Sequence, residues 1–434
     1  MKLNFRKMTW GYRVSSYIIL LVIGTFLVYF PILDNRFLMN WDDQWVVVNR
    51  YTEGGVNFEN ISAIFLEFYS SQYAPFNELF YLFLYRFFGY DSYVFHFACL
   101  VIHIINIILI FFISIKLLRN VSAIKADHAL IISFLISLYF GIHPFNVEAV
   151  SWISASKVLI YATFYLLATI SYISYLERKE LKHYLLTALF FTCSFFGKEQ
   201  AVIFPLWMMV LNLMYGYQFF EWKTWRGVIP FFVLSLSFGI LTMLSQLEAG
   251  YGVLSKEATY PIWQRFFLGS YAYFEYLLKI VFPFKLYYLY PFPSNVGSPL
   301  PNWILIYPLL ICVIGFSFWK VIKSPPFFIG IAIFTLHILL ALHIIPLSRH
   351  AVVADRYAYI SSIGIGFIIF YYLYLLYGRS NHYIKKSLLV GVILFLIYLG
   401  KYSHTRTYEW HDSESVKNRI THLLKKDLAN LSAS

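Results

Sequence analysis

The chain has 434 residues, of which 60% are hydrophobic and only 13% charged, and its mean hydropathy is +0.64. Soluble domains average about 45–50% apolar and about 25% charged residues, so this composition excludes both a soluble globular protein and a disordered chain. The net charge of +12 is spread between apolar runs and forms no patch of the kind that binds nucleic acid. The composition therefore predicts an all-α integral membrane protein.

Eleven segments are predicted to cross the membrane, because a spanning helix needs about 20 mostly apolar residues. The first span follows four basic residues, which place the N-terminus in the cytoplasm by the positive-inside rule. It has no small-residue cleavage site after it, which indicates a retained helix and not a signal peptide. The predicted spans are 14–33, 93–117, 128–143, 155–176, 184–197, 200–215, 227–247, 302–321, 327–347, 357–377 and 384–400.

Segment 262–283 is long enough to span but carries Arg265, Glu275 and Lys279. We expect it to be an amphipathic helix at the outer interface, because the later basic turns then stay on the cytoplasmic side. This topology predicts one transmembrane domain over residues 1–400 and a short non-cytoplasmic tail over 401–434. Its two long outer segments, 34–92 and 248–301, each contain an amphipathic helix.

The acidic residues are distributed unevenly in this topology. Only four of the 22 carboxylates face the cytoplasm, namely Asp127, Glu177, Glu180 and Glu221. The positive-inside rule concerns basic residues and does not require this bias. We therefore expect the chemistry of the protein on the outer side.

The first polar cluster after the opening span is the adjacent pair Asp42 and Asp43. Neighbouring carboxylates repel, so one of them tends to have a raised pKa, which suits a general base or a cation site. The alternative is a solvated pair in a loop. Further along, His96 and His103 are seven residues apart and share one face of a helix, where they either line a pocket or form hydrogen bonds inside the core.

Two outer turns carry the next ionisable groups. His143, Glu148 and Lys157 surround one turn, where the last two could simply neutralise each other. Lys198 and Glu199 form the other turn and could be a local structural pair. Both turns lie directly between apolar segments, where a charge costs roughly 2.5–3.5 kcal/mol and needs a reason.

The last cluster contains Arg349, Asp355, Arg356 and Tyr357. Arginine offers paired donors to phosphate oxygens, so this stretch is suited to hold a phosphate, although arginines also anchor helix ends. All five clusters fall on the same side of the predicted topology. Together they predict one outer cavity with carboxylates and cations, as expected for an enzyme that acts on an anionic lipid head group.

The residues that form these clusters resemble a known family. The matching order is Trp41-Asp42-Asp43, Asn49, Tyr73, Pro75, Gly89, His96, His103, His143-Pro144, Glu148-Ala149-Val150, Trp152, Lys157, Lys198-Glu199, Pro205, Ala354-Asp355-Arg356-Tyr357, Tyr359, Ser361-Ser362 and Gly364. From about residue 20 to 420 the chain resembles the membrane domain of the transmembrane and tetratricopeptide-repeat O-mannosyltransferases. These enzymes belong, with the protein O-mannosyltransferases, to the GT-C class of polytopic glycosyltransferases.

The resemblance implies a GT-C fold and the transfer of a sugar, such as mannose, from a polyprenyl-phosphate donor to an acceptor hydroxyl on the non-cytoplasmic face. Asp42 and Asp43 are then the catalytic carboxylates, with Asp42 the first choice, and Arg356, Arg349 and Lys198 bind the donor phosphate. The remaining residues of the implied substrate pocket are His96, His103, His143, Glu148, Lys157, Glu199, Asp355 and Tyr357. The sequence departs from the family at Ala74-Pro75-Phe76, where Arg-Pro-Leu is usual, and in the absence of the repeats.

Several alternatives remain open. The acceptor could be a protein serine or threonine, a glycolipid or a polysaccharide, and the main rival function is a transporter or flippase of lipid-linked sugars. No cofactor is expected apart from a divalent cation that Asp42 and Asp43 could bind, and the three cysteines lie in separate apolar runs unsuited to a zinc site. The expected partners are membrane lipids, the lipid-linked sugar and the acceptor, with no nucleic acid. The expected location is the bacterial inner membrane, with the active site facing outward.

Overall fold

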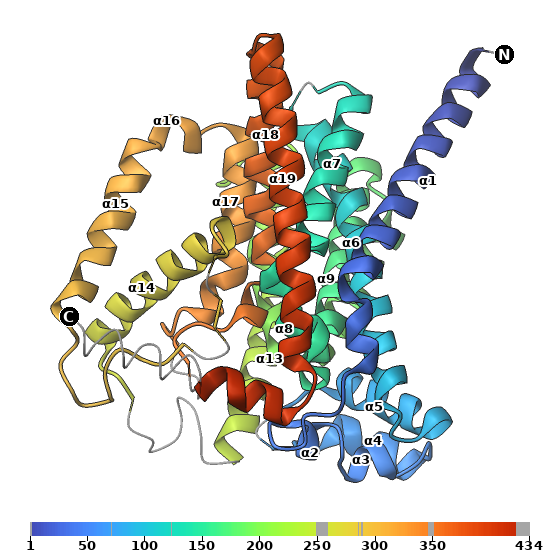
Figure 1. Ribbon diagram of the computed structural model, residues 1–434, viewed down its shortest axis with the longest axis vertical. Helices are drawn as coiled ribbons and strands as arrows, with labels where there is room; N and C mark the ends of the chain where they lie inside the picture. The colour runs from blue at the N-terminus through green and yellow to red at the C-terminus, as the bar shows by residue number, and fades with distance from the viewer. Residues whose placement is uncertain are drawn as a thin grey trace.

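In a computed structural model of the chain, long helices lie side by side (Figure 1). The structure describes residues 2–421 apart from 71, 123, 249–258, 285, 288–289 and 346–350, and it describes no side chains for 2–10 and 121. Every regular element in these residues is a helix. The predicted all-α architecture is therefore confirmed.

The α-helices are α1 (Lys2–Tyr29), α2 (Asp43–Val46), α3 (Arg50–Glu53), α4 (Phe58–Leu66), α5 (Pro75–Phe88), α6 (Ser92–Val121), α7 (Ala126–Gly141), α8 (Val147–Ser151), α9 (Ser156–Arg178), α10 (Leu181–Gly197), α11 (Phe204–Met214), α12 (Trp222–Arg226), α13 (Ile229–Glu248), α14 (Ile262–Val281), α15 (Tyr307–Ser317), α16 (Trp319–Ile322), α17 (Pro325–Ile338), α18 (Ser361–Arg379) and α19 (His382–Thr407). The 3-10 helices are η1 (Phe30–Asp34), η2 (Pro144–Asn146), η3 (Ile153–Ala155), η4 (Glu199–Ile203), η5 (Asn302–Ile306), η6 (Leu339–Ala341), η7 (Asp355–Ala358) and η8 (Tyr408–Trp410).

Within the described ranges, six helical segments are long and apolar enough to cross a membrane. They are Gly11–Asp34, Ser92–Asn120, Ile153–Arg178, Ile229–Glu248, Ser361–Arg379 and His382–Trp410. A seventh is formed by Ala126–Gly141 and Pro144–Ser151 if the two helices, bent by 47°, count as one span. These lengths and compositions indicate a multi-pass membrane protein.

The other four segments expected to span form shorter helices, α10, α11, α15 and α17. A proline stands in the first turn of three of them, namely Pro205, Pro308 and Pro325. Proline is tolerated in the first turn of an α-helix but not in its interior, so each of these α-helices begins there, and only the 3-10 helices η4 and η5 precede α11 and α15. This is why the long apolar runs of the sequence overstate the number of long helices.

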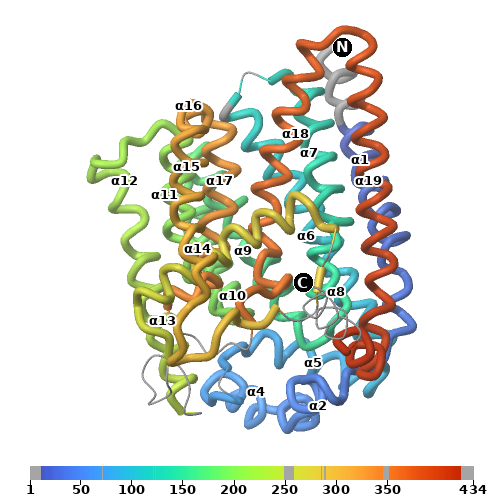
Figure 2. The backbone as a smooth tube through the Cα atoms, turned by 60° about the vertical axis from the view of Figure 1, so that its left-hand side comes forward, coloured from blue at the N-terminus to red at the C-terminus, as the bar shows by residue number. Residues whose placement is uncertain are grey.

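Two ion pairs mark one end of the helices, which we call the basic end. Arg13 of α1 pairs with Asp127 of α7 at 2.9 Å, and Lys116 of α6 pairs with Glu177 of α9 at 2.6 Å. The start of α1 lies at this end, and the short helices α2–α5 gather at the other, which we call the acidic end (Figures 1 and 2). The first outer segment, 34–92, is therefore a folded unit of four short helices, of which α5 is the longest.

Helix α14 lies obliquely to the long helices in both views (Figures 1 and 2). Its buried residues Leu268, Ala272 and Tyr276 recur at every fourth position, as they do in an amphipathic helix. It is not among the segments able to span, so the predicted amphipathic character of 262–283 is supported. Helix α19 continues through 401–407 into the predicted C-terminal tail.

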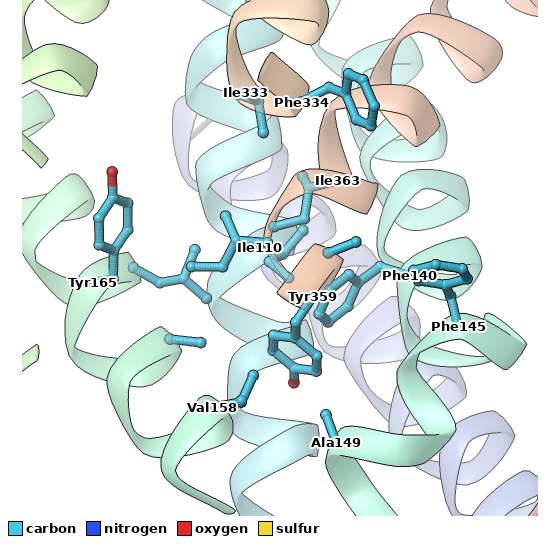
Figure 3. Close-up of a cluster of buried hydrophobic side chains, with 14 of the residues drawn as sticks. Ile110, Phe140, Phe145, Ala149, Val158, Tyr165, Ile333, Phe334, Tyr359 and Ile363 are labelled. Atoms are coloured by element: carbon cyan, nitrogen blue, oxygen red, sulfur yellow. The ribbon is translucent and has the colours of Figure 1, made fainter. Parts of the chain in front are cut away.

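The core lies where α6, α7, α9, α17 and α18 meet, and aromatic and branched side chains fill it (Figure 3). Phe140, Tyr359 and Ile110 are fully buried there. Helices α17 and α18 cross at Gly330 and Gly364, where a Cβ on Gly364 would lie only 2.2 Å from the carbonyl oxygen of Gly330. Small residues of this kind allow close helix contact inside membranes.

Candidate active site

The two aspartates of the first outer segment have different surroundings. Asp43 is fully buried, and its Oδ2 accepts a hydrogen bond from the backbone N–H of Leu38 at 2.7 Å. Its Oδ1 accepts from the backbone N–H of Ser154 at 3.1 Å and from the Ser154 hydroxyl. Burial raises the pKa of Asp43, although these hydrogen bonds lower it. Asp43 thus ties the first outer segment to η3, and both of its oxygens are occupied.

Asp42 is half-buried and stands directly before α2. Its φ of 133° lies in a region that residues other than glycine rarely adopt, and such strained positions cluster at functional sites. Its Oδ1 accepts a hydrogen bond from Trp45 Nε1 at 3.3 Å, and its backbone N–H donates to Gln44 at 2.9 Å. Of the two aspartates, Asp42 is therefore the one that a substrate can reach.

The last polar cluster of the sequence contacts the turn that follows α7. Arg356 of η7 forms an ion pair with Glu148 of α8, and its backbone N–H donates to the same carboxylate at 3.1 Å. Its guanidinium also lies over the rings of Trp152 and Tyr357, 5.2 and 4.9 Å from their centroids. Glu148 thus pairs with Arg356 across 208 residues, which disfavours the alternative in which Glu148 and Lys157 neutralise each other.

The acidic pair and Arg356 converge on one short segment. Asp43 binds Ser154, and Arg356 lies over Trp152, two residues earlier in the chain. Two residues span at most about 7 Å along the chain, so the two contacts lie on neighbouring parts of one short segment. The structure therefore links Asp43 and Arg356, which are far apart in the sequence, through this one short segment.

Two lysines join Arg356 in a group of three cations. Lys198 Nζ lies 5.3 Å from the centroid of the Tyr357 ring and 3.6 Å from Glu199 Oε1. Lys157 lies within electrostatic range of Lys198, Glu199 and Arg356, and it donates a hydrogen bond to Gln72. Three cations against Glu148 and Glu199 leave this region suited to an anion such as a phosphate.

The three histidines of the predicted pocket lie in the core. His103 Nε2 donates to Gly141 at 3.0 Å and its Nδ1 accepts from the Tyr359 hydroxyl at 2.6 Å. His143 Nε2 donates to Ile280 at 3.0 Å and its Nδ1 accepts from Phe145 at 3.1 Å. Neither ring has a nitrogen left for a substrate, so these two residues are structural and the expectation that they line the pocket is corrected. His96 is also buried, on α6.

Asp355, the neighbour of Arg356, points to a different partner. Its Oδ2 lies 3.0 Å from Arg406 Nη1, and both side chains are buried. Arg406 also donates to the carbonyl of Pro144 at 3.1 Å. The sequence did not lead us to Arg406, although a basic residue at the end of an apolar helix could have indicated it. Arg349, the other predicted phosphate ligand, lies outside the described residues.

The described residues contain no group of three histidine, cysteine or acidic side chains placed to hold a metal ion. Asp42 and Asp43, the pair expected to bind a divalent cation, are adjacent in the chain, and both oxygens of Asp43 already accept hydrogen bonds. Compared with models of known protein families, the chain matches none, and it also matches no curated protein.

Proposed function

We propose that the protein is a membrane glycosyltransferase that moves a sugar from a polyprenyl-phosphate donor to an acceptor hydroxyl at the acidic end. One observation carries this proposal: Asp43, the neighbour of the strained Asp42, binds Ser154, and Arg356 of the group of three cations lies over Trp152, two residues before Ser154. Such a transfer needs a general base and a binding site for the anionic leaving group. The resemblance of the sequence to GT-C enzymes supports the same reaction class.

The proposed reaction is a single displacement. Asp42 accepts the proton of the acceptor hydroxyl as that oxygen forms a bond to the anomeric carbon of the sugar. The bond from this carbon to the phosphate oxygen breaks, its electron pair leaves with the polyprenyl phosphate, and the anomeric configuration inverts. Arg356, Lys198 and Lys157 stabilise the negative charge on the leaving phosphate.

The proposal includes a topology. The four shorter helices α10, α11, α15 and α17 also cross the membrane, which gives eleven spans and a GT-C fold. The basic end then faces the cytoplasm, as its lysines and arginines favour, and the active site faces outward. In a bacterial cell this is the outer face of the inner membrane.

The test compares Asp42→Asn with Asp34→Asn in reconstituted protein. Asp34 is an exposed carboxylate of the same outer segment, so its variant controls for the loss of a charge. The probes are polyprenyl-phosphate mannose and glucose with a radiolabelled sugar, and the acceptors are membranes from the source cells. Asp42→Asn should lower transfer about 10²- to 10⁴-fold, as expected for the loss of a general base, while Asp34→Asn stays active.

Full transfer by Asp42→Asn would overturn the assignment of the base. A protein that moves the labelled lipid between leaflets but never releases polyprenyl phosphate would be a flippase. That outcome would overturn the proposed reaction altogether.

A further inference from the structure

A hollow of about 440 Å³ opens at the basic end between α1 and α7. Ligand pockets typically measure about 300–1,000 Å³, so the hollow has room for a small ligand or for part of a larger one. It lies at the opposite end of the long helices from α2 and the other short helices of the first outer segment (Figure 1). The proposed reaction makes no use of it.

The packing of α1 explains why the hollow forms at this end. Farther from the basic end the two helices approach closely, since a Cβ on Gly141 would lie only 3.0 Å from Thr25 Oγ1. Nearer the basic end the large ring of Tyr17 makes the contact, packing against Phe134 of α7 with the ring centroids 5.0 Å apart. Helix α1 leans away from α7 toward its N-terminus (Figure 1). The two helices therefore diverge, and the hollow lies between them.

The hollow is polar where it opens at the basic end and apolar deeper inside. Arg13 and Asp127 line its polar part, where the apolar segments of α1 and α7 begin. Leu20 comes seven residues after Arg13, about 10 Å deeper at 1.5 Å per residue, and Leu130 and Ile131 follow Asp127 by about one turn. Charged groups at the ends of spanning helices lie at the level of the lipid head groups. The hollow thus has the same order of polarity as a lipid molecule.

The apolar part of the hollow is accessible from the bilayer. Leu20 is 53% exposed and Ile131 is 45% exposed, so both side chains face the acyl chains of the surrounding lipid. Acyl chains are as apolar as leucine, so a chain that moves from the bilayer into the hollow gains little from the hydrophobic effect. The head group therefore determines which lipid the hollow prefers.

The polar part of the hollow carries one cation and one anion. Arg13 Nη1 lies 2.9 Å from Asp127 Oδ1, and the two side chains are 58% and 64% exposed. An exposed ion pair contributes little stability, so both groups can turn toward a ligand. The guanidinium has five N–H donors and suits phosphate oxygens, while the carboxylate accepts hydrogen bonds from an ammonium group. This pair of charges is complementary to a phosphate joined to a primary ammonium group.

We infer that the hollow binds one phospholipid whose head group is phosphoethanolamine. Arg13 binds its phosphate, Asp127 binds its ammonium group, and one acyl chain lies against Leu20 and Ile131. Asp127 repels lipids with a net negative charge, and a trimethylated ammonium lacks the N–H groups that this carboxylate accepts. The inference does not depend on the proposed transferase function, because the lipid lies at the opposite end of the molecule and takes part in no reaction.

The experiment counts the lipids bound to the full-length protein by native mass spectrometry in detergent, while one lipid at a time is titrated. The three lipids have the same dioleoyl chains and carry phosphoethanolamine, phosphocholine or phosphoglycerol as the head group. Asp127→Asn and Arg13→Gln test the head-group contacts. Glu177→Gln is their matched control, because Glu177 is another partly exposed carboxylate of an ion pair at the basic end and does not line the hollow.

A second pair of variants tests the apolar part of the hollow. Leu20→Trp places a larger side chain in it. Leu27→Trp is the matched control, because Leu27 is 60% exposed on the same helix and does not line the hollow. All these substitutions replace exposed or partly exposed side chains, so each variant should keep the apparent Tm of the wild type.

Phosphatidylethanolamine should bind at one site about 10-fold more tightly than the other two lipids. Asp127→Asn should reduce this preference to about twofold or less, whereas Arg13→Gln and Leu20→Trp should each raise the Kd of all three lipids about 10-fold. Both control variants should bind as the wild type does.

Three results would overturn the inference. The first is equal affinity for the three lipids, or tightest binding of phosphatidylglycerol, which would indicate a site for anionic lipids. The second is a preference for phosphatidylethanolamine that survives Asp127→Asn. The third is equal binding by Leu20→Trp and Leu27→Trp, because the lipid would then lie outside the hollow.

Discussion

The ion pair between Glu148 and Arg356 should respond unequally to the loss of each partner. The Glu148 side chain is only 3% exposed, whereas 25% of the Arg356 side chain is exposed. Arg356→Met leaves a carboxylate buried without its partner, which typically costs about 3–5 kcal/mol. Glu148→Gln leaves a cation that reaches water and rests on the Trp152 ring, so we expect about 1.5–3 kcal/mol, the value of a hydrogen bond to a charged group.

The assay is thermal unfolding of the purified protein, followed by tryptophan fluorescence at one fixed scan rate. From highest to lowest, the expected order of apparent Tm is wild type, then Glu148→Gln, then Arg356→Met. The double variant should have a higher Tm than Arg356→Met, because it no longer carries the buried, unpaired carboxylate of Glu148. Arg13→Met is the control, since the Arg13–Asp127 pair is 58% and 64% exposed and should contribute under about 1 kcal/mol. Equal losses for the two single variants, or purely additive losses in the double variant, would refute this reasoning.

Three further predictions concern the fold and its pH dependence, and apparent Tm measures each of them. Gly364→Ala should cost about 1–3 kcal/mol because its Cβ meets the Gly330 carbonyl, whereas Gly378→Ala on the same helix has nothing within 4 Å and should not lower Tm. Burial raises the pKa of Glu78 from 4.5 to about 7, so the protonated carboxyl stabilises the fold below about pH 4.5 and this contribution is lost as the pH rises to about 7. The Tm of the wild type relative to that of Glu78→Gln should therefore fall between these two pH values. A Tm difference that does not change with pH would contradict the shift. Asp43→Asn places an amide donor among the three groups that donate hydrogen bonds to Asp43, and it should lower the stability by about 1–3 kcal/mol. An unchanged Tm would contradict the role of Asp43 in holding the first outer segment against η3.

The sequence predicts an all-helical, multi-pass membrane protein correctly because apolar run length indicates both features, although it overstates the number of long helices. It also predicts that distant clusters share one side of the protein, and the contacts of Asp43 with Ser154 and of Arg356 with Trp152 link two of them. Both results follow from properties that are local along the chain, namely hydropathy and the distribution of charge. Tertiary contacts are not required for either.

The pairing of individual groups could not be predicted in this way. Asp42 and Asp43 are identical residues one position apart, and only in the structure does one of them prove to be buried, with Leu38 and Ser154 as its partners. The seven-residue spacing of His96 and His103 predicts a shared helix face, but the carbonyl that occupies the ring of His103 belongs to Gly141 on another helix. A residue's role here depends on its partner, and the partner comes from a distant segment.

Two neighbouring residues of η7, one acidic and one basic, form ion pairs with different helices, and these pairs fix the position of the proposed phosphate-binding site. Asp355 pairs with Arg406 of α19, while Arg356 pairs with Glu148 of α8. A shift of η7 by one residue would bring Asp355 toward Glu148 and leave the buried Arg406 with only the more distant Glu409, at 3.7 Å, and both changes are unfavourable in a buried site. The two ion pairs, one through an acidic and one through a basic residue of η7, therefore allow only one position of η7 along the chain. In that position the Arg356 guanidinium lies over the Trp152 ring, and a quarter of its side chain is exposed.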